Sequence, residues 1–352
     1  MVNEIAAVLQ PRHGGLYIDM TFGAGGHTKK LLESRKDITV IAVDRDYVAY
    51  EKALSLAKDV STLNERWGTK QSVIPVHGKF SEVLNKLHLY GVNKNSVDGI
   101  IMDLGASSIQ YDDPIRGFSI SHNGPLDMRM DRSNRNHDIT AADVVNTLDS
   151  EELAKIFKAY GEERRSRKIA SAIVDLRFML KKLATTEELA RVVMTVCPVG
   201  TDALGRFSHP ATRTFQALRI FVNNELNELN YALTKMREFL KCAPGNVDDS
   251  NDEARNSNEA GRAAVLTFHS LEDRIVKRHL TGVDLDEPIV RRLSQHARLQ
   301  TNVIESTEIL EEVLHPKFWQ PLSKHVAVAS DEEVMGNPRS RSAKLRIAQR
   351  IG

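Results

Sequence analysis

The sequence predicts an α/β fold: a doubly wound sheet split by a helical insertion. Short, continuously apolar segments alternate with helical stretches through the first hundred residues, which is typical of a parallel sheet buried on both faces. From about residue 111 the sequence becomes polar and then helical, with no strong strand signal. We therefore expect a first part of the sheet domain at residues 1–112, a helical insertion at 113–208 and a second part at 209–352.

The predicted strands are apolar segments, most of which end on Asp or Gly. They cover residues 16–19, 38–44, 73–78, 99–103, 263–268 and 344–348. Helices are predicted at residues 28–34, 48–64, 141–160, 164–180 and 186–196. A long helix is predicted at residues 215–240, because its apolar residues recur at three- and four-residue spacings. Residues 246–261 contain an acidic stretch without large apolar residues, so we expect a mobile surface loop there.

Composition places the chain among ordinary globular proteins. It has 352 residues, 41% hydrophobic and 27% charged, with a net charge of +1. This excludes a disordered or polybasic chain. Only two cysteines are present, Cys197 and Cys242, which favours a reducing compartment and leaves no zinc framework, so no metal site is expected. No apolar segment approaches the roughly 18 residues of a membrane span, so a soluble protein is expected.

A glycine-rich turn follows the first predicted strand. Residues 19–28 read DMTFGAGGHT, at the position where a nucleotide-type ligand meets the carboxyl end of a parallel sheet. The dinucleotide pattern G-x-G-x-x-G is not satisfied, because Thr28 replaces its last glycine. This disfavours a pyrophosphate site and hence an NAD-linked oxidoreductase. The alternative is a turn that only reverses the chain.

Acidic residues end three of the predicted strands. Asp19 ends the first strand, Asp44 the second and Asp103 the fourth, and a carboxylate in the position of Asp44 accepts hydrogen bonds from ribose hydroxyls. A glycine turn flanked by such acids is expected for an adenosyl cofactor without a diphosphate, which S-adenosylmethionine fits. Phe80, just after the third strand, either flanks the adenine or belongs to the core. Asp103 either faces the same crevice or caps the turn that follows it.

Several longer segments resemble the ribosomal small-subunit RNA (cytosine-N4) methyltransferases, the MraW/RsmH family. They span nearly the whole chain in the family's order: DGIIMDLGASSIQ at 98–110, RGFS at 116–119, GPLDMRMD at 124–131, YGEE at 160–163, HPATRTFQALR at 209–219, FHSLEDRIVKR at 268–278 and NPRSRSAKLR at 337–346. The segment RIFVNNELNEL at 219–229 is more similar to the animal mitochondrial branch.

The resemblance implies a Rossmann-like S-adenosylmethionine domain with a helical insertion that recognises RNA. It implies N4-methylation of a small-subunit rRNA cytidine, in the mitochondrial matrix or, for a bacterial-type member, in the cytoplasm. The cofactor residues carried over by motif are Gly25, Gly26, His27, Asp44, Phe80, Asp103 and Gln110. The alternative is a small-subunit assembly factor of the same fold whose methylation is dispensable.

Cytosine N4 is a poor nucleophile because its lone pair is delocalised into the ring. Acceptors on its N–H groups, together with in-line orientation, would favour attack. Our candidates are Asp103, Asp127 and Asp131, of which the last two would share one face of a helical turn. Alternatively, they pair with Arg116, Arg129 or Arg132 to hold the loop. The histidines at 27 and 269 are expected to serve structure or cofactor binding rather than act as bases.

Basic residues gather in two parts of the sequence and are candidates for binding phosphates of rRNA or of a pre-ribosomal small subunit. The insertion contributes Arg164, Arg165, Arg167, Lys168, Arg177, Lys181 and Lys182, and the C-terminal part contributes Arg339, Arg341, Lys344, Arg346 and Arg350. Alternatively, each group is a solvated surface. The target cytidine is expected in an unpaired or splayed segment of RNA.

Overall fold

The chain folds into two compact units. The structure, a computed structural model, describes residues 1–131, 139–179, 182–198, 200–201, 207–243, 260–281, 318–323 and 325–352. The first unit comprises Met1–Asp44, Val48–Leu104 and Glu228–Gly352. The second comprises Arg45–Tyr47 and Gly105–Asn227. Most of the acidic loop expected at 246–261 lies outside the described residues.

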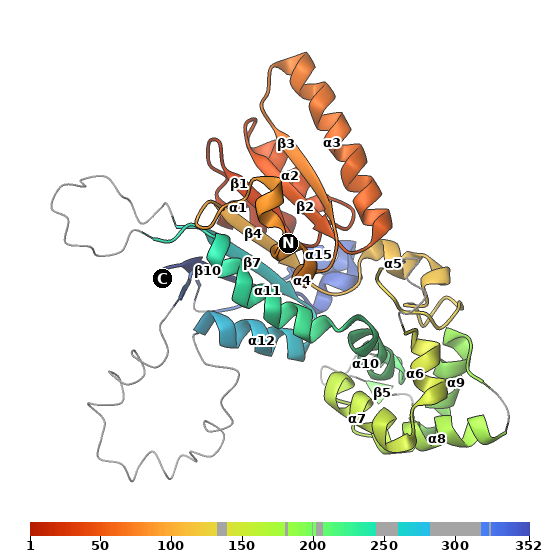
Figure 1. Cartoon of the computed structure of the whole chain (residues 1–352). Helices are drawn as coiled ribbons and strands as arrows, with labels where there is room; N and C mark the ends of the chain where they lie inside the picture. The colour runs from red at the N-terminus through yellow and green to blue at the C-terminus, as the bar shows by residue number, and fades with distance from the viewer. Residues whose placement is uncertain are drawn as a thin grey trace, which may run out of the picture. The chain divides into compact units, whose positions relative to one another are not determined.

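The first unit is built on an eight-stranded sheet within the described part of the chain (Figure 1). Its strands are β1 (Leu16–Asp19), β2 (Thr39–Asp44), β3 (Ser72–His77), β4 (Gly99–Asp103), β7 (Arg262–Thr267), β8 (Trp319–Pro321), β9 (Ala327–Val328) and β10 (Lys344–Arg350). The order is β3-β2-β1-β4-β7-β10-β8, with β9 beside β10. The first five strands of this order are parallel, whereas β10 is antiparallel to its neighbours. All six predicted strands are confirmed, but the direction of β10 was not predicted.

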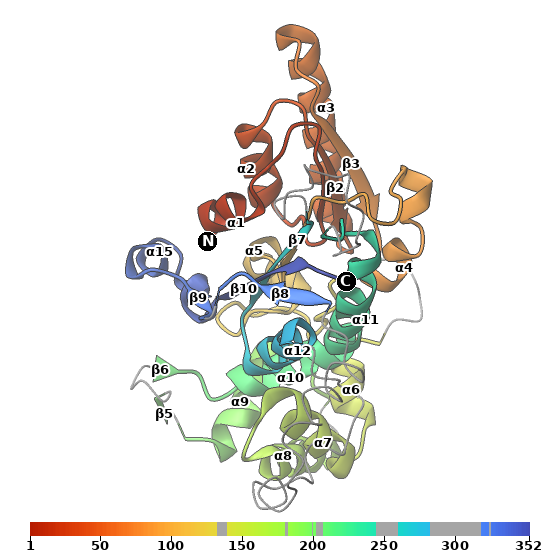
Figure 2. The ribbon, with the colours of Figure 1, turned by 90° about the vertical axis from the view of Figure 1, so that its left-hand side faces the viewer.

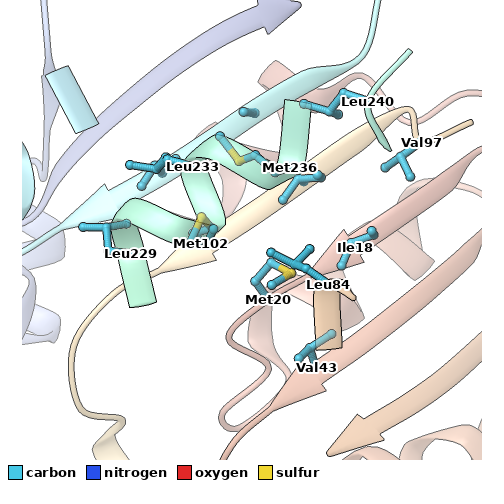
Figure 3. Close-up of a cluster of buried hydrophobic side chains, with 14 of the residues drawn as sticks. Ile18, Met20, Val43, Leu84, Val97, Met102, Leu229, Leu233, Met236 and Leu240 are labelled. Atoms are coloured by element: carbon cyan, nitrogen blue, oxygen red, sulfur yellow. The ribbon is translucent and has the colours of Figure 1, made fainter. Parts of the chain in front are cut away.

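Helices cover both faces of this sheet, which confirms the doubly wound α/β prediction. Helices α1 (Val2–Leu9), α2 (Gly26–Ser34) and α3 (Tyr47–Trp67) share an apolar cluster with Tyr17 and Ile101. Helices α4 (Phe80–Leu84), α11 (Glu225–Phe239) and α12 (Ser270–Thr281) share another with Ile18 and Met102. Successive strand residues point to opposite faces, so each strand supplies both clusters. Figure 3 shows Leu229, Leu233 and Met236 of α11 beside Met102 of β4.

Shorter elements complete the first unit: η1 (Leu87–Tyr90), α15 (Asp331–Gly336) and η5 (Pro338–Ser342). Within the described residues, none of the helices combines the length and the apolar character needed to cross a membrane.

The second unit is mainly helical (Figure 2). Its elements are α5 (Ser108–Asp112), η2 (Pro114–Arg116), α6 (Ala141–Thr147), α7 (Ser150–Gly161), α8 (Ser166–Phe178), α9 (Thr186–Val196), β5 (Gly200–Thr201), β6 (Phe207–Ser208) and α10 (Thr212–Asn223). Helix α7 packs against α8 and α10, and α8 packs against α9. Phe157 of α7 and Leu218 of α10 are fully buried in the common core.

Two helix predictions and the expected boundaries differ from the structure. The helix expected at 215–240 is two helices, because Asn224 adopts a left-handed conformation with φ 52° that ends α10, and asparagine tolerates this region better than most residues. The helix expected at 141–160 is interrupted because Asp149 caps a new helix, accepting from the Glu152 N–H. The second unit is larger than the insertion expected at 113–208, since α10 buries its apolar face in that unit's core.

Candidate functional site

The glycine turn connects β1 to α2 in the first unit. Gly25 has φ 79°, and a Cβ on it would lie 2.6 Å from the ring of Phe22, which is buried. Only glycine adopts this conformation there without strain. Gly26 differs, because a Cβ on it would meet no atom of the described residues within 4 Å. Gly25 therefore serves the backbone, whereas Gly26 leaves open space beside the turn.

Asp44, at the end of β2, holds this turn. Its Oδ2 atom accepts a hydrogen bond of 2.7 Å from the Gly23 N–H, and the Phe22 N–H donates to the Val43 carbonyl at 2.9 Å. Because β1 and β2 are parallel neighbours, the carboxyl end of β2 lies beside the residues that follow β1. The predicted adjacency of Asp44 and the glycine turn is therefore present, and ribose binding by Asp44 stays a prediction.

A histidine–aspartate pair lies beside the turn, and its Asp103 side chain is 35% exposed. His27 Nε2 is 3.2 Å from Asp103 Oδ2, and the His27 side chain is 10% exposed. Burial lowers the pKa of His27, but the hydrogen bond to Asp103 and the charges of Asp19 and Asp103 outweigh it, so the pKa is raised. Burial raises the pKa of Asp19, which accepts hydrogen bonds from Thr28 and Thr21. The structure thus brings His27 and two of the predicted strand-end acids together.

Each residue of the His27–Asp103 pair has a second polar side-chain atom that could bind a ligand. Among the described residues, His27 Nδ1 and Asp103 Oδ1 are buried without a hydrogen-bond partner. A buried polar atom without a hydrogen-bond partner is rare in native proteins, because its burial costs free energy that no hydrogen bond offsets. These features suit a polar ligand. The pair offers hydrogen-bonding atoms, Gly26 leaves space and Asp44 provides a carboxylate at a strand end.

Phe80 begins α4 and packs, partly buried, against the apolar cluster beneath it. The next residue fixes this helix start: the N–H and the hydroxyl of Ser81 both donate to the Glu228 carboxylate of α11, at 3.0 Å and 2.8 Å. Core packing, the simpler of the two sequence expectations for Phe80, is present. The role of Glu228 was missed, because no local pattern connects residues 147 positions apart.

Gln110 belongs to the second unit. Its amide group donates to Asp46 Oδ2 at 2.8 Å and to the Met130 carbonyl at 3.2 Å, while its Oε1 accepts from the Ser107 N–H. The structure therefore gives Gln110 partners within its own unit, and cofactor binding by this residue stays a prediction.

Asp127 and Asp131 also lie in the second unit, and they do not share a helical turn. Met128 between them has φ 61°, so this loop is not helical and that expectation is wrong. Asp127 forms two hydrogen bonds with the Arg129 guanidinium, at 2.7 Å and 2.9 Å. Asp131 pairs with Arg45, with 3.3 Å between Asp131 Oδ2 and Arg45 Nη2. Pairing with Arg129 is one of the alternatives considered from the sequence, whereas pairing with Arg45 was missed.

The remaining candidates divide into structural and exposed groups. His269 Nε2 lies 3.0 Å from Glu272 Oε1 at the start of α12, and the structural or cofactor role expected for it stays a prediction. Lys344 and Arg346 both pair with Asp273, so two of the five C-terminal basic residues expected to meet RNA form ion pairs within the fold. In the second unit Arg164, Arg167, Lys168 and Lys182 are exposed. Lys181 and Arg132 lie outside the described residues.

Comparison with known proteins decides the family. A model described as the MraW methylase family matches residues 1–351. The chain belongs to the MraW methylase family. The family resemblance found in the sequence is confirmed, and so is the predicted enzyme class, a methyltransferase. The mixed sheet covered by helices is the Rossmann-like methyltransferase fold expected of this family.

Named relatives agree with membership of the MraW methylase family. The chain is 42% identical, over its full length, to the 12S rRNA N(4)-cytidine methyltransferase METTL15 of Mus musculus and covers 82% of that protein. It is 41% identical, over 99% of its length, to the ribosomal RNA small subunit methyltransferase H of Sorangium cellulosum and covers 89% of it. A Culex quinquefasciatus protein that carries the name of a receptor-type tyrosine-protein phosphatase, mosPTP-1, is 44% identical, and the chain spans only 22% of its length.

Proposed function

We propose that this protein transfers a methyl group from S-adenosylmethionine to N4 of a cytidine in small-subunit ribosomal RNA, in mitochondria. Membership of the MraW methylase family and the names of the mouse and bacterial relatives support this reaction. The mitochondrial location rests on the resemblance to the animal branch. The observation that carries the proposal is the partly buried His27–Asp103 pair beside the glycine turn.

The residues of the first unit suit the cofactor. When bound, S-adenosylmethionine supplies an electrophilic methyl group on a sulfonium. Gly25 would shape the turn, Gly26 would let the backbone approach the cofactor, Asp44 would accept from the ribose hydroxyls and Phe80 would flank the adenine. His27 Nδ1 and Asp103 Oδ1, which have no hydrogen-bond partner among the described residues, are atoms that a polar ligand would satisfy.

Asp103 is the central candidate for activating the substrate. A carboxylate oxygen that accepts a hydrogen bond from the amino group would turn the N4 lone pair out of conjugation with the ring. His27 would hold the Asp103 carboxylate in one orientation through its 3.2 Å contact. Asp127 and Asp131 remain candidates for a second acceptor.

The experiment is methyl transfer from labelled S-adenosylmethionine to small-subunit particles or their RNA, followed by mapping of N4-methylcytidine in mitochondrial and cytosolic rRNA after removal of the protein. Loss of the modification at one mitochondrial small-subunit cytidine is expected. Two results would replace the proposed function with a role in assembly. One is that the protein binds no cofactor, and the other is that particle assembly requires the protein but does not require methylation.

A further inference from the structure

The loop between Pro125 and Asp131 has no regular secondary structure, yet its centre is fully hydrogen-bonded. The Met128 N–H donates to the Arg116 carbonyl at 3.0 Å and the Met130 N–H donates to Asn223 Oδ1 at 2.8 Å. The carbonyl of Met128 accepts from Asn223 Nδ2 at 2.7 Å. Both methionine side chains are buried in the core of the second unit. The buried backbone groups of this irregular stretch are therefore paired, as they would be in a regular element.

Asn223 makes two of these bonds from the end of α10. Its side chain is 2% exposed, and Nδ2 also donates to the Arg219 carbonyl of its own helix at 2.8 Å. The helix stops one residue later, at the left-handed Asn224. The Asn223 amide thus hydrogen-bonds both to its own helix and to residues 128 and 130 of the loop. These bonds fix the position of the loop relative to the end of α10.

Arg116 and Gln110 hold the same loop from its other side. Arg116 Nη2 donates to the Arg129 and Met130 carbonyls at 3.2 Å and 2.7 Å. Gln110 also donates to the Met130 carbonyl. The Asp46 carboxylate accepts from both Arg116 and Gln110 at 2.8 Å, which orients them. Arg116 and Asp46 are each 2% exposed. A buried ion pair of this kind adds little net stability and is better suited to selecting one geometry.

The two candidate acids, Asp127 and Asp131, are the residues on either side of this fixed backbone. Met128, next to Asp127, has a positive φ of 61°, a conformation that persists in methionine only where the surroundings impose it. Asp131 is paired with Arg45, which directly follows Asp44 in the sequence. The directions of both carboxylates therefore depend on how the backbone at 128–130 is held.

We propose that Asn223 is a positioning residue for methyl transfer: it fixes the backbone at residues 128–130 and thereby the directions of Asp127 and Asp131, without touching substrate itself. This rests on the proposed function, because it assumes that these acids act on the methyl acceptor. Asn223 affects the rate of transfer through the loop and not through the affinity for the cofactor.

The second unit contains a matched control for Asn223. Asn146 of α6 donates to the carbonyl four residues earlier on its own helix, Ala142, at 2.8 Å, and also exchanges hydrogen bonds with both backbone groups of Leu183. Asn223→Ala and Asn146→Ala thus remove the same three kinds of bond, two to another segment and one to the parent helix. Of the two, only Asn223→Ala removes hydrogen bonds to the backbone at residues 128–130; the segments that Asn146 joins bond to the loop at Leu126 and Asp127 through their own backbone.

The experiment compares kcat and KM for RNA methylation, the Kd for S-adenosylmethionine and Tm in both variants and the unmodified protein. In Asn223→Ala we expect kcat to fall by about 10- to 100-fold, with KM and Kd changed by no more than about twofold. Asn146→Ala should lower Tm to a similar degree and keep kcat within about twofold. An unchanged kcat in Asn223→Ala, or an equal loss of kcat in both variants, would overturn the proposal.

Two further measurements keep the outcomes separate. If Asn223→Ala does not fold, Asn223→Asp retains the acceptor for Met130 and lacks the donors to Met128 and Arg219, and Asn146→Asp is its control. In the unmodified protein, amide hydrogen exchange at Met128 and Met130 should be as slow as in α10, and rapid exchange would overturn the fixed loop. Absence of methylation by the unmodified protein would instead reject the proposed function.

Discussion

His27 Nε2 lies 3.2 Å from Asp103 Oδ2, so a buried imidazole supports a carboxylate at the end of a central strand. The two residues come from neighbouring strand ends, since His27 follows β1 and Asp103 ends β4. The backbone N–H of Asp103 also donates to the Thr21 hydroxyl at 2.6 Å, which fixes the strand end itself. Asp103 is therefore held at its backbone and at one oxygen, with the other oxygen left for a ligand.

Replacing this carboxylate tests its role most directly. Asp103→Asn keeps the size of the side chain and removes its charge, so we expect the rate of methyl transfer to fall by about 10²- to 10⁴-fold. The measurement is single-turnover transfer from labelled cofactor. Binding of S-adenosylmethionine, followed by calorimetry, should remain detectable. A rate within threefold of the unmodified protein would remove Asp103 from the mechanism.

The same variant should change the titration of His27. Because the hydrogen bond and charge of Asp103 raise the pKa of His27 against its burial, Asp103→Asn should lower it. A raised folded-state pKa stabilises the fold below the unfolded value, about 6.5, and this contribution is lost as pH rises through the folded pKa. The stability difference between the two proteins should therefore shrink as pH rises through the folded-state pKa of His27. NMR titration of the His27 ring and urea unfolding at several pH values measure both effects.

The two glycines of the turn predict opposite phenotypes. Gly25→Ala places a Cβ 2.6 Å from the Phe22 ring at a positive φ, so it should destabilise the fold by about 1–3 kcal/mol. In Gly26→Ala the added Cβ meets no atom of the described part of the chain within 4 Å, so the free energy of unfolding should stay within about 0.5 kcal/mol. Its methyl group would occupy the space proposed for the cofactor and should weaken binding at least tenfold. Calorimetry and urea unfolding of both variants separate the two roles.

The sequence was sufficient for the strand ends and insufficient for the loop of the second unit. Asp19, Asp44 and Asp103 could be placed at one edge because apolar segments mark parallel strands and parallel strands end at the same side. The break at Asn224 could not be predicted, since the apolar spacing continues across it. The pairing of Asp131 with Arg45 depends on tertiary structure alone, because 86 residues separate them.

Glu228 should influence cofactor binding from outside the site. Its carboxylate caps α4 by accepting from the N–H and the hydroxyl of Ser81, next to Phe80. Glu228→Gln removes the charge at a helix start, which should cost about 1 kcal/mol and loosen Phe80. We expect the Kd for S-adenosylmethionine to rise about three- to tenfold. Glu238→Gln on the same helix is the control, because Glu238 pairs with Lys235 instead; equal effects would argue against a local role.

Arg346 should matter for acid stability rather than for RNA. Burial raises the pKa of Asp273, but the hydrogen bonds and charges of Arg346 and Lys344 outweigh it, so the pKa is lowered. This stabilisation is present above the unfolded value, about 3.8, and is lost as pH falls through the folded pKa. Arg346→Met should therefore move the acid-unfolding midpoint to higher pH. RNA affinity should remain within about twofold, and a loss of RNA binding without a change in acid unfolding would reverse this assignment.

Arg167 is the corresponding test on the second unit. It is exposed on α8, beside the exposed Lys168 and after the exposed Arg164 in the sequence, so its charge is available to a phosphate. Neutralising one phosphate contact lowers the slope of log Kd against log salt by about one and weakens binding regardless of sequence. Arg167→Met should therefore bind small-subunit RNA more weakly at low salt, with a smaller salt slope and an unchanged Tm. An unchanged slope would mean that this basic surface only faces solvent.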